Sequence, residues 1–292
     1  MGRFAQLGRL DLSKIATVPS TTASKVVASS NTAASPLFQF QNASFVYEPF
    51  PIGIVTPIIE EGLYQRLLDS YPDISLFKKM SYLGSKDSVK YSLAEMNNPD
   101  EYRQFLANTP VWKDFYDWVK SPDFIVRSLA FLARHNIELG LLRPKSAEPE
   151  RSLLERVADV IKGKKVKDTL PLSARFEFSV LPADGGQLHP HTDSPSKIVT
   201  WVISMVKPGQ WNPDFGGGTD MMRPKKTELN FNWVNRYLEF DEVDILRTFD
   251  FRPNQGLIFV KTFNSWHGVR TMTGSGSDLL RRTLTINIEK ID

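Results

Sequence analysis

The sequence predicts an α+β protein in which a mainly helical region precedes an antiparallel β-sandwich or jelly roll. Two patterns support this fold class. Residues 37–170 place apolar side chains at helical spacing. From Ser173 onward, short segments rich in Val, Ile, Phe and Thr alternate with clusters of Gly, Pro, Asn and Asp, without helices between them. Strands that follow one another in this way are expected to pair antiparallel.

The helical region is read from apolar spacing and from proline positions. Pro51 to Pro57 predicts an extended entry, and Ile59, Leu63 and Leu67 predict a helix over 58–68. The remaining expected elements are a helix that begins at Pro99–Asp100, one or two helices over 111–132, a short amphipathic helix over 153–161 and a basic surface loop over 162–167.

Six strands are expected in the second region, separated by turn residues. They cover 174–182, 197–206, 218–223, 243–251, 256–262 and 281–289. Residues 225–242 are too long for a tight turn, so we interpret them as an insertion that carries Trp233 and Tyr237. The expected organisation is a flexible N-terminal arm (1–36), a supporting region (37–170) and a β core (171–292) integrated into one domain with it.

Composition excludes several classes of function. The 292 residues contain no cysteine, which rules out disulfides, zinc–thiolate sites and thiol nucleophiles. A formal net charge of +3 is too small to predict nucleic-acid binding by itself. No apolar run approaches the length of a membrane span. We therefore expect a cytoplasmic protein, although the acid-poor, Arg-containing arm is also compatible with a targeting segment.

The segment Leu188–Asp193 holds the strongest chemical signal. In an extended chain, residues two apart project to the same face, so His191 and Asp193 can offer a nitrogen and a carboxylate oxygen to one ion. The only histidine further along the chain is His267, which makes it the candidate third ligand. Two histidines and one carboxylate on one face of an octahedral ion leave three positions open, as in non-haem Fe(II) oxygenases.

The last predicted strand supplies a second signal. Leu284, Ile286 and Ile288 share one face, whereas Arg281 and Thr283 share the other. An arginine on the polar face can hold a carboxylate in bidentate fashion, which lysine cannot do. A register slip of one residue would give this role to Arg282 instead.

With these residues the sequence resembles the Fe(II)- and 2-oxoglutarate-dependent dioxygenases, particularly the prolyl-hydroxylase-like branch. The resemblance covers about 173–289 and includes the glycine turn Gly216–Thr219. It implies a double-stranded β-helix (jelly-roll/cupin-like) core with supporting N-terminal helices. It also implies Fe(II), 2-oxoglutarate and O2 as cofactor and cosubstrates, and a hydroxylase that releases succinate and CO2 while it oxidises an unactivated C–H bond. The presence of Asp193 disfavours the related halogenases, which have a small residue there.

The resemblance and the strand pattern together assign candidate roles. The expected iron ligands are His191, Asp193 and His267; the expected 2-oxoglutarate contacts are Arg281, Thr283 and Thr200; the candidate substrate contacts are Arg175, Glu177, His189 and Trp266. For Trp266, core packing is the first interpretation and a substrate contact the second, and for Arg175 and Glu177 the alternative is ordinary sheet packing. The substrate is expected to be a small molecule or a peptide.

Three other interpretations stay open. A cupin-type site would use His189 with His191, but the glutamate expected a few residues later is missing from 192–200. A non-catalytic β-sandwich could keep the metal ligands without turnover. A nucleic-acid demethylase would need a basic groove, for which the sequence offers Lys197, Lys207, Arg223, Lys225 and Lys226 near the mouth.

Overall fold

The computed structural model describes residues 37–82, 85–139 and 172–291. The expected N-terminal arm, the helix over 153–161 and the basic loop over 162–167 lie outside the described residues. Within the described part, two antiparallel sheets and four α-helices form a mixed α/β structure, as the sequence predicts.

The large sheet has eight strands in the order β1-β2-β10-β7-β12-β5-β4-β3. Their bounds are β1 Ala43–Val46, β2 Ile52–Val55, β3 Lys78–Tyr82, β4 Ser85–Ala94, β5 Leu172–Pro182, β7 Lys197–Ser204, β10 Gly256–Val260 and β12 Leu280–Lys290. The small sheet has the order β6-β11-β8-β9, with β6 Leu188–His191, β8 Thr219–Pro224, β9 Val243–Phe249 and β11 His267–Val269. Every neighbouring pair is antiparallel.

All six expected strands are present, as β5, β7, β8, β9, β10 and β12. The sequence did not predict β6 and β11 as strands, because four and three residues are too few to show alternation. The extended entry expected from Pro51 to Pro57 contains β2, whereas β1, β3 and β4 were not predicted; these four strands extend the large sheet at both edges. The region before residue 140 is therefore a mixture of helices and edge strands.

Four helices lie in this region: α1 Glu61–Asp69, α2 Pro99–Asn108, α3 Pro110–Lys120 and α4 Pro122–Arg134. The last three each begin with a proline in the first turn, where its fixed φ favours the helix and its missing N–H costs nothing. The expected helix over 58–68 and the expected helix that begins at Pro99–Asp100 are thus confirmed. The one or two helices expected over 111–132 are present as α3 and α4. None of the described helices is long and apolar enough to cross a membrane.

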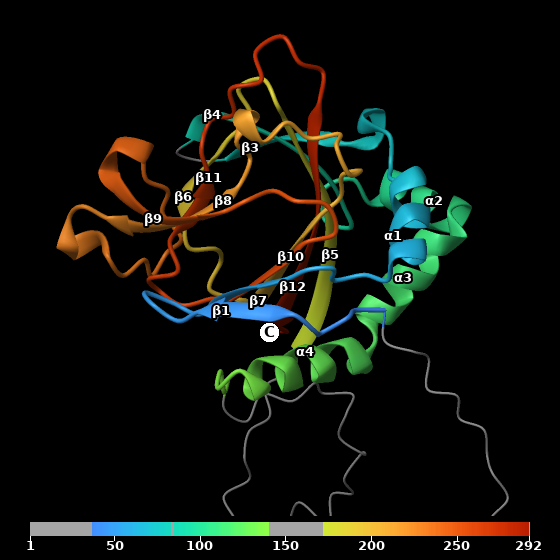
Figure 1. Cartoon of the computed structure of the whole chain (residues 1–292), viewed down its shortest axis with the longest axis horizontal. Helices are drawn as coiled ribbons and strands as arrows, with labels where there is room; N and C mark the ends of the chain where they lie inside the picture. Colours follow the sequence, from blue (N-terminus) through green and yellow to red (C-terminus); the bar gives the residue numbers. More distant parts are fainter. Residues whose placement is uncertain (1–36, 83–84, 140–171, 292) are drawn as a thin grey trace, which may run out of the picture. The chain divides into compact units, whose positions relative to one another are not determined.

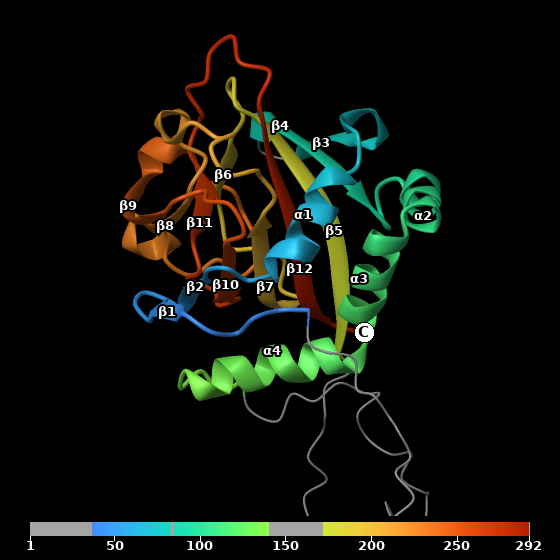
Figure 2. The ribbon, with the colours of Figure 1, turned by 45° about the vertical axis from the view of Figure 1, so that its right-hand side comes forward.

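The main core lies between the helices and the large sheet. Figures 1 and 2 show α1 to α4 on one side of this sheet and the small sheet on the other. Trp112 of α3 packs edge-on against Phe178 of β5, with ring centroids 4.7 Å apart. Phe131 of α4 stacks on Trp201 of β7 at 5.8 Å. Because these aromatic side chains fill the helical face, the polar side chains of the same strands are left for the space between the two sheets.

Strand β12 shows this division most clearly. Leu284, Ile286 and Ile288 are fully buried in the core that faces the helices. Arg281 and Thr283 alternate with them and line a cavity on the opposite side. The face assignment predicted for this strand is confirmed.

Candidate active site

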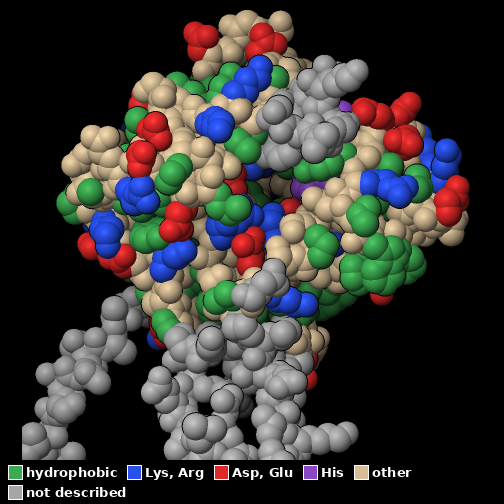
Figure 3. All heavy atoms as spheres, turned by 180° about the vertical axis from the view of Figure 1, so that it is seen from behind, with side chains coloured by type: hydrophobic (Ala, Val, Ile, Leu, Met, Phe, Trp, Pro, Cys, Tyr) green, Lys and Arg blue, Asp and Glu red, His purple; other side chains and the backbone are tan. Residues whose placement is uncertain are grey.

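A cavity of about 280 Å³ lies between the two sheets. Its walls include polar residues of β5, β7 and β12 on the large sheet, together with His191 and His267 of the small sheet. Figure 3 looks onto the face where the molecule is hollowed, and histidine side chains are visible there. A volume of this size is at the low end of ligand pockets, which range from about 300 to 1,000 Å³.

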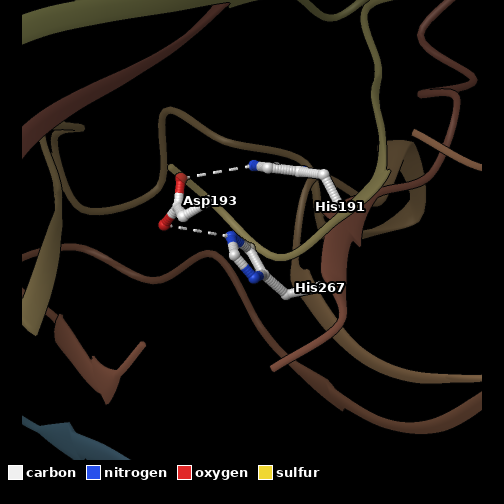
Figure 4. Close-up of side chains that lie close together, drawn as sticks. All are labelled: His191, Asp193 and His267. Carbon is white, nitrogen blue, oxygen red and sulfur yellow. Dashed lines mark ion pairs between the residues drawn. The ribbon is translucent and has the colours of Figure 1, made fainter. Parts of the chain in front are cut away.

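Three side chains converge at one end of this cavity, as Figure 4 shows. His191 ends β6 and His267 begins β11, and the two residues are direct partners across this strand pair. Asp193 follows β6 two residues later. One ligand atom from each residue lies within 4.8 Å of the other two. His191 Nε2 lies 3.5 Å from Asp193 Oδ1, and His267 Nε2 lies 3.7 Å from Asp193 Oδ2.

Backbone carbonyls orient both imidazole rings. His191 Nδ1 lies 2.9 Å from the carbonyl oxygen of His189, and His267 Nδ1 lies 2.8 Å from that of Ser265. A carbonyl can only accept, so each Nδ1 carries the proton and each Nε2 presents its lone pair toward Asp193. This is the tautomer that a metal ligand requires.

The charge state of the group also suits a cation. Burial and the neighbouring His191 lower the pKa of His267 to about 3, so its ring is neutral near pH 7. Although burial raises the pKa of Asp193, the ammonium of Lys197 outweighs it and holds the pKa well below its usual value. Lys197 Nζ lies 2.6 Å from Asp193 Oδ1.

The backbone at Asp193 is unusual, with φ at 71°. A non-glycine residue is uncommon in the left-handed region, and such strain is often found at functional sites. Two nitrogen lone pairs and one ionised carboxylate on a buried surface fit a ferrous ion and leave three coordination positions open. The donor set therefore agrees with the metal that the sequence predicts.

Arg281 lies in the same cavity and has unusual surroundings. Its side chain is buried, its Nε donates to the carbonyl oxygen of Gly217, and its guanidinium lies 4.9 Å from the ring centroid of Phe251. Burial lowers the pKa of Arg281 to about 10, so the group stays charged at neutral pH. Within the described residues no carboxylate forms an ion pair with Arg281. A buried guanidinium without an ion-pair partner suits the carboxylate of a ligand.

Gly217 explains how this close approach is possible. Its φ is 84°, and a Cβ atom at this position would lie 3.0 Å from Trp211 and 3.3 Å from Cδ of Arg281. Any other residue would be strained and crowded here. Arg282, the alternative candidate for holding the carboxylate of 2-oxoglutarate, does not line the cavity. Its guanidinium lies 5.6 Å from the ring centroid of Tyr71.

Some of the residues predicted to contact 2-oxoglutarate or substrate line the cavity, and others do not. Thr200, Thr283, Arg175 and Glu177 line the cavity together with Arg281. Thr200 Oγ1 lies 3.0 Å from Asn287 Oδ1 and 3.3 Å from Asp193 Oδ2.

Two of the expected substrate contacts do not reach the cavity. Trp266 is buried among the apolar side chains of another cluster and donates from Nε1 to the carbonyl oxygen of Asn230. His189 stacks on Phe240 at 5.3 Å, and its Nδ1 lies 3.3 Å from Glu239. Neither side chain is among those that line the cavity, and a substrate contact by either residue stays a prediction. His189 instead contributes its backbone carbonyl, which orients His191.

Several cavity residues had no role in the sequence interpretation. Tyr237, in the 225–242 insertion, stacks on His191 at 5.2 Å with an interplanar angle of 18°. Phe259 packs against His267 at 4.5 Å. Lys90 enters the cavity from β4. Aromatic residues in the insertion were a visible signal for Tyr237, whereas no local pattern marks Lys90, whose position depends on the pairing of β4 with β5.

The basic residues expected near the mouth do not form a groove. Of Lys197, Lys207, Arg223, Lys225 and Lys226, only Lys197 is among the residues that line the cavity. Lys207 pairs with Asp69, and Arg223 lies 3.9 Å from Asp244.

Comparisons with known proteins give weak likenesses. No family model matches the sequence, and no curated protein matches it. The solved structures that are similar over 82% of the chain include the following three. A prolyl hydroxylase from Trichoplax adhaerens in complex with a hypoxia-inducible-factor peptide has a TM-score of 0.44 and 12% identity, with 83% of its chain covered. The non-heme α-ketoglutarate-dependent epimerase SnoN has a TM-score of 0.41, 12% identity and 76% coverage. EvdO2 from Micromonospora carbonacea has a TM-score of 0.39, 10% identity and 86% coverage.

The chain is thus similar to 2-oxoglutarate- and Fe(II)-dependent oxygenases, prolyl hydroxylases among them, at low identity. TM-scores below 0.5 carry no argument about the reaction. The functional conclusion therefore rests on the side chains of the site.

Proposed function

We propose that the protein is an Fe(II)- and 2-oxoglutarate-dependent oxygenase that hydroxylates an unactivated C–H bond of a small molecule or peptide. The observation that carries the proposal is the buried group His191, Asp193 and His267 in one cavity with the guanidinium of Arg281, which has no ion pair among the described residues. In this proposal, strands β5 to β12 form a double-stranded β-helix with the metal between its two sheets.

Each side chain has a defined task in this scheme. His191 Nε2, His267 Nε2 and one oxygen of Asp193 hold the ion, and Arg281 holds the distal carboxylate of 2-oxoglutarate. Thr283 and Thr200 line the wall where the cosubstrate lies and offer hydroxyl groups to it. Bound iron supplies the oxidising chemistry, in which O2 is activated at the expense of 2-oxoglutarate, which is converted to succinate and CO2.

The surrounding residues hold these groups in place and exclude water. The carbonyls of His189 and Ser265 fix the imidazole rings before metal arrives, so little reorganisation is needed. Tyr237 and Phe259 cover the rings of His191 and His267. Lys197 keeps Asp193 ionised and limits the directions in which its carboxylate can turn.

The test is anaerobic reconstitution of the full chain with Fe(II) and 2-oxoglutarate. The chelate is expected to give a weak visible metal-to-ligand charge-transfer band, and His191→Ala is expected to abolish it. His135→Ala is the matched control, because His135 lies outside the cavity at the end of α4. Wild-type protein that shows no band and binds no 2-oxoglutarate would refute the proposal.

Turnover distinguishes the proposal from a binding module that keeps the metal group. Admission of O2 to the loaded protein is expected to produce succinate, even when no substrate is present to couple the reaction. A normal band without any succinate would favour the non-catalytic alternative.

A further inference from the structure

A cluster of charged side chains forms one wall of the cavity on the strands β4 and β5. Lys90 Nζ lies 2.7 Å from Glu177 Oε1, and Arg175 Nη1 lies 3.7 Å from Glu177 Oε2. All three residues line the cavity, and their side chains are 8 to 23% exposed. Figure 3 shows Lys and Arg side chains gathered beside the hollow. The scheme for iron and 2-oxoglutarate uses none of them.

Glu177 holds this wall in place. Its Oε1 also accepts hydrogen bonds from Ser92 and Ser179, each at 3.0 Å. Although burial raises the pKa of Glu177, the ion pair with Lys90, with help from Arg175, lowers it to about 2. The carboxylate is therefore a fixed anchor that keeps both cations at the cavity surface, and a glutamate already bound to internal donors is a poor site for a substrate ammonium.

The charges around the cavity do not cancel. The cations that line it are Lys90, Arg175, Lys197 and Arg281, and the carboxylates are Glu177 and Asp193, with Glu289 held against Arg175 at 3.0 Å. Among the described residues, four cations thus face three carboxylates, with the histidines counted as neutral ligands. Fe(II) and the dianion of 2-oxoglutarate compensate each other. One positive charge is left over in the loaded site, and it is best balanced by a monoanion.

We propose that the substrate is a small carboxylic acid whose carboxylate is bound by Lys90 and Arg175. This inference rests on the proposed function, because the charge balance includes iron and 2-oxoglutarate. Guanidinium and ammonium groups bind carboxylates through strong charge-assisted hydrogen bonds, and Arg175 can do so in bidentate fashion.

The sheet register sets the length of this acid. Arg175 is the direct partner of Asn287, which is the direct partner of Thr200 beside Asp193. Two strand spacings, or about 10 Å, separate the backbone of Arg175 from that of Thr200. A short chain of about four carbons fits this interval in a cavity that must also hold 2-oxoglutarate. The carboxylate then lies away from the metal, and the far end of the carbon chain lies beside it.

Butyrate is a suitable first ligand to test, with butyramide as its neutral match. Mn(II) binds to the same nitrogen and oxygen ligands, and its paramagnetism broadens the proton resonances of molecules nearby. In protein loaded with Mn(II) and 2-oxoglutarate, butyrate is expected to broaden and butyramide is not. The methyl protons should broaden more than the protons beside the carboxylate; the reverse order would mean that the carboxylate binds to the metal and would overturn the assignment.

Substitutions of Arg175 and Lys90 test whether these two residues bind butyrate. Arg175→Gln leaves the Lys90–Glu177 pair intact and is expected to weaken butyrate binding about tenfold or more, the loss expected for a charged hydrogen bond. Lys90→Met should do the same, and Lys90→Arg should restore binding in part. Lys79→Met is the matched control, because Lys79 is exposed on the neighbouring strand and does not line the cavity.

The proton resonances of 2-oxoglutarate distinguish a failure of the carboxylic-acid assignment from a failure of the proposed function. If 2-oxoglutarate broadens but butyrate does not, or if butyrate and butyramide broaden equally, the carboxylic-acid assignment is wrong and the proposed function stands. If inorganic phosphate displaces butyrate at equal concentration, the site prefers a dianion and the assignment is also wrong. If neither Mn(II) nor 2-oxoglutarate binds, the proposed function itself fails.

Discussion

Replacing Glu177 with glutamine is expected to change how stability depends on pH. The folded protein depresses the pKa of Glu177 from 4.5 to about 2, because the pairing with Lys90 and Arg175 outweighs the effect of burial. A carboxyl group with a depressed folded pKa stabilises the protein above its unfolded pKa, here above 4.5. The contribution is lost as the pH falls through the interval from 4.5 toward 2.

The magnitude follows from these two values. The difference between 4.5 and about 2 corresponds to about 3 kcal/mol of unfolding free energy at neutral pH. By about pH 3, linkage removes about 2 kcal/mol of it. Glutamine cannot titrate, so the variant lacks this part of the acid-induced loss, whatever the substitution costs at pH 7. Other carboxyl groups titrate in both proteins and cancel in the comparison.

Urea unfolding at about pH 7 and about pH 3 measures this difference. Wild type is expected to lose about 2 kcal/mol more than Glu177→Gln between the two conditions. Glu138→Gln, at an exposed glutamate after α4, controls for the loss of one carboxylate. Equal losses in wild type and Glu177→Gln would refute the account of Glu177 as an ionised anchor.

Two further predictions concern the cosubstrate and the core. Arg281→Lys is expected to weaken 2-oxoglutarate binding about 10- to 100-fold in calorimetry of the metal-loaded protein, because lysine cannot form the bidentate pair. Arg282→Lys should leave this affinity unchanged, since Arg282 lies over Tyr71 outside the cavity lining, and an equal loss in both variants would contradict the assignment. Phe178→Ala should lower the unfolding free energy by about 3–5 kcal/mol in urea titrations, because Phe178 is fully buried against Trp112; a loss below about 1 kcal/mol would contradict this packing.

Strand β12 shows how much of the site sequence could predict. Its alternation separates Leu284 and Ile286 from Arg281 and Thr283, and the structure places the two pairs in the core and in the cavity lining respectively. Period-two alternation is a local property that survives folding. The His191 and Asp193 pair was predicted from the same period of two, but Asp193 lies beyond the end of β6 with φ at 71°, so its position depends on a local turn of the backbone rather than on strand alternation.

The place of Lys90 in the wall with Arg175 and Glu177 was not predictable, because it depends on pairing between distant strands. Lys90 reaches Glu177 only because β4 lies beside β5 in the large sheet. Nothing near residue 90 marks β4 as a strand next to a cavity. Trp266, for which core packing was the first interpretation and a substrate contact the second, packs in a separate apolar cluster.

The two faces of the large sheet have different roles because residues alternate between them along each strand. One face of β5 is committed to aromatic packing through Phe176 and Phe178, so its alternate residues Arg175 and Glu177 must face the cavity. The buried carboxylate of Glu177 is paired with cations, and Lys90 from β4 supplies the nearer one. In the proposed function, β4 thus gives the protein a place to bind one end of a molecule whose other end reacts. Removing the charge at Lys90 or Arg175 is therefore expected to change which molecule this oxygenase would oxidise, while the group His191, Asp193 and His267 stays intact.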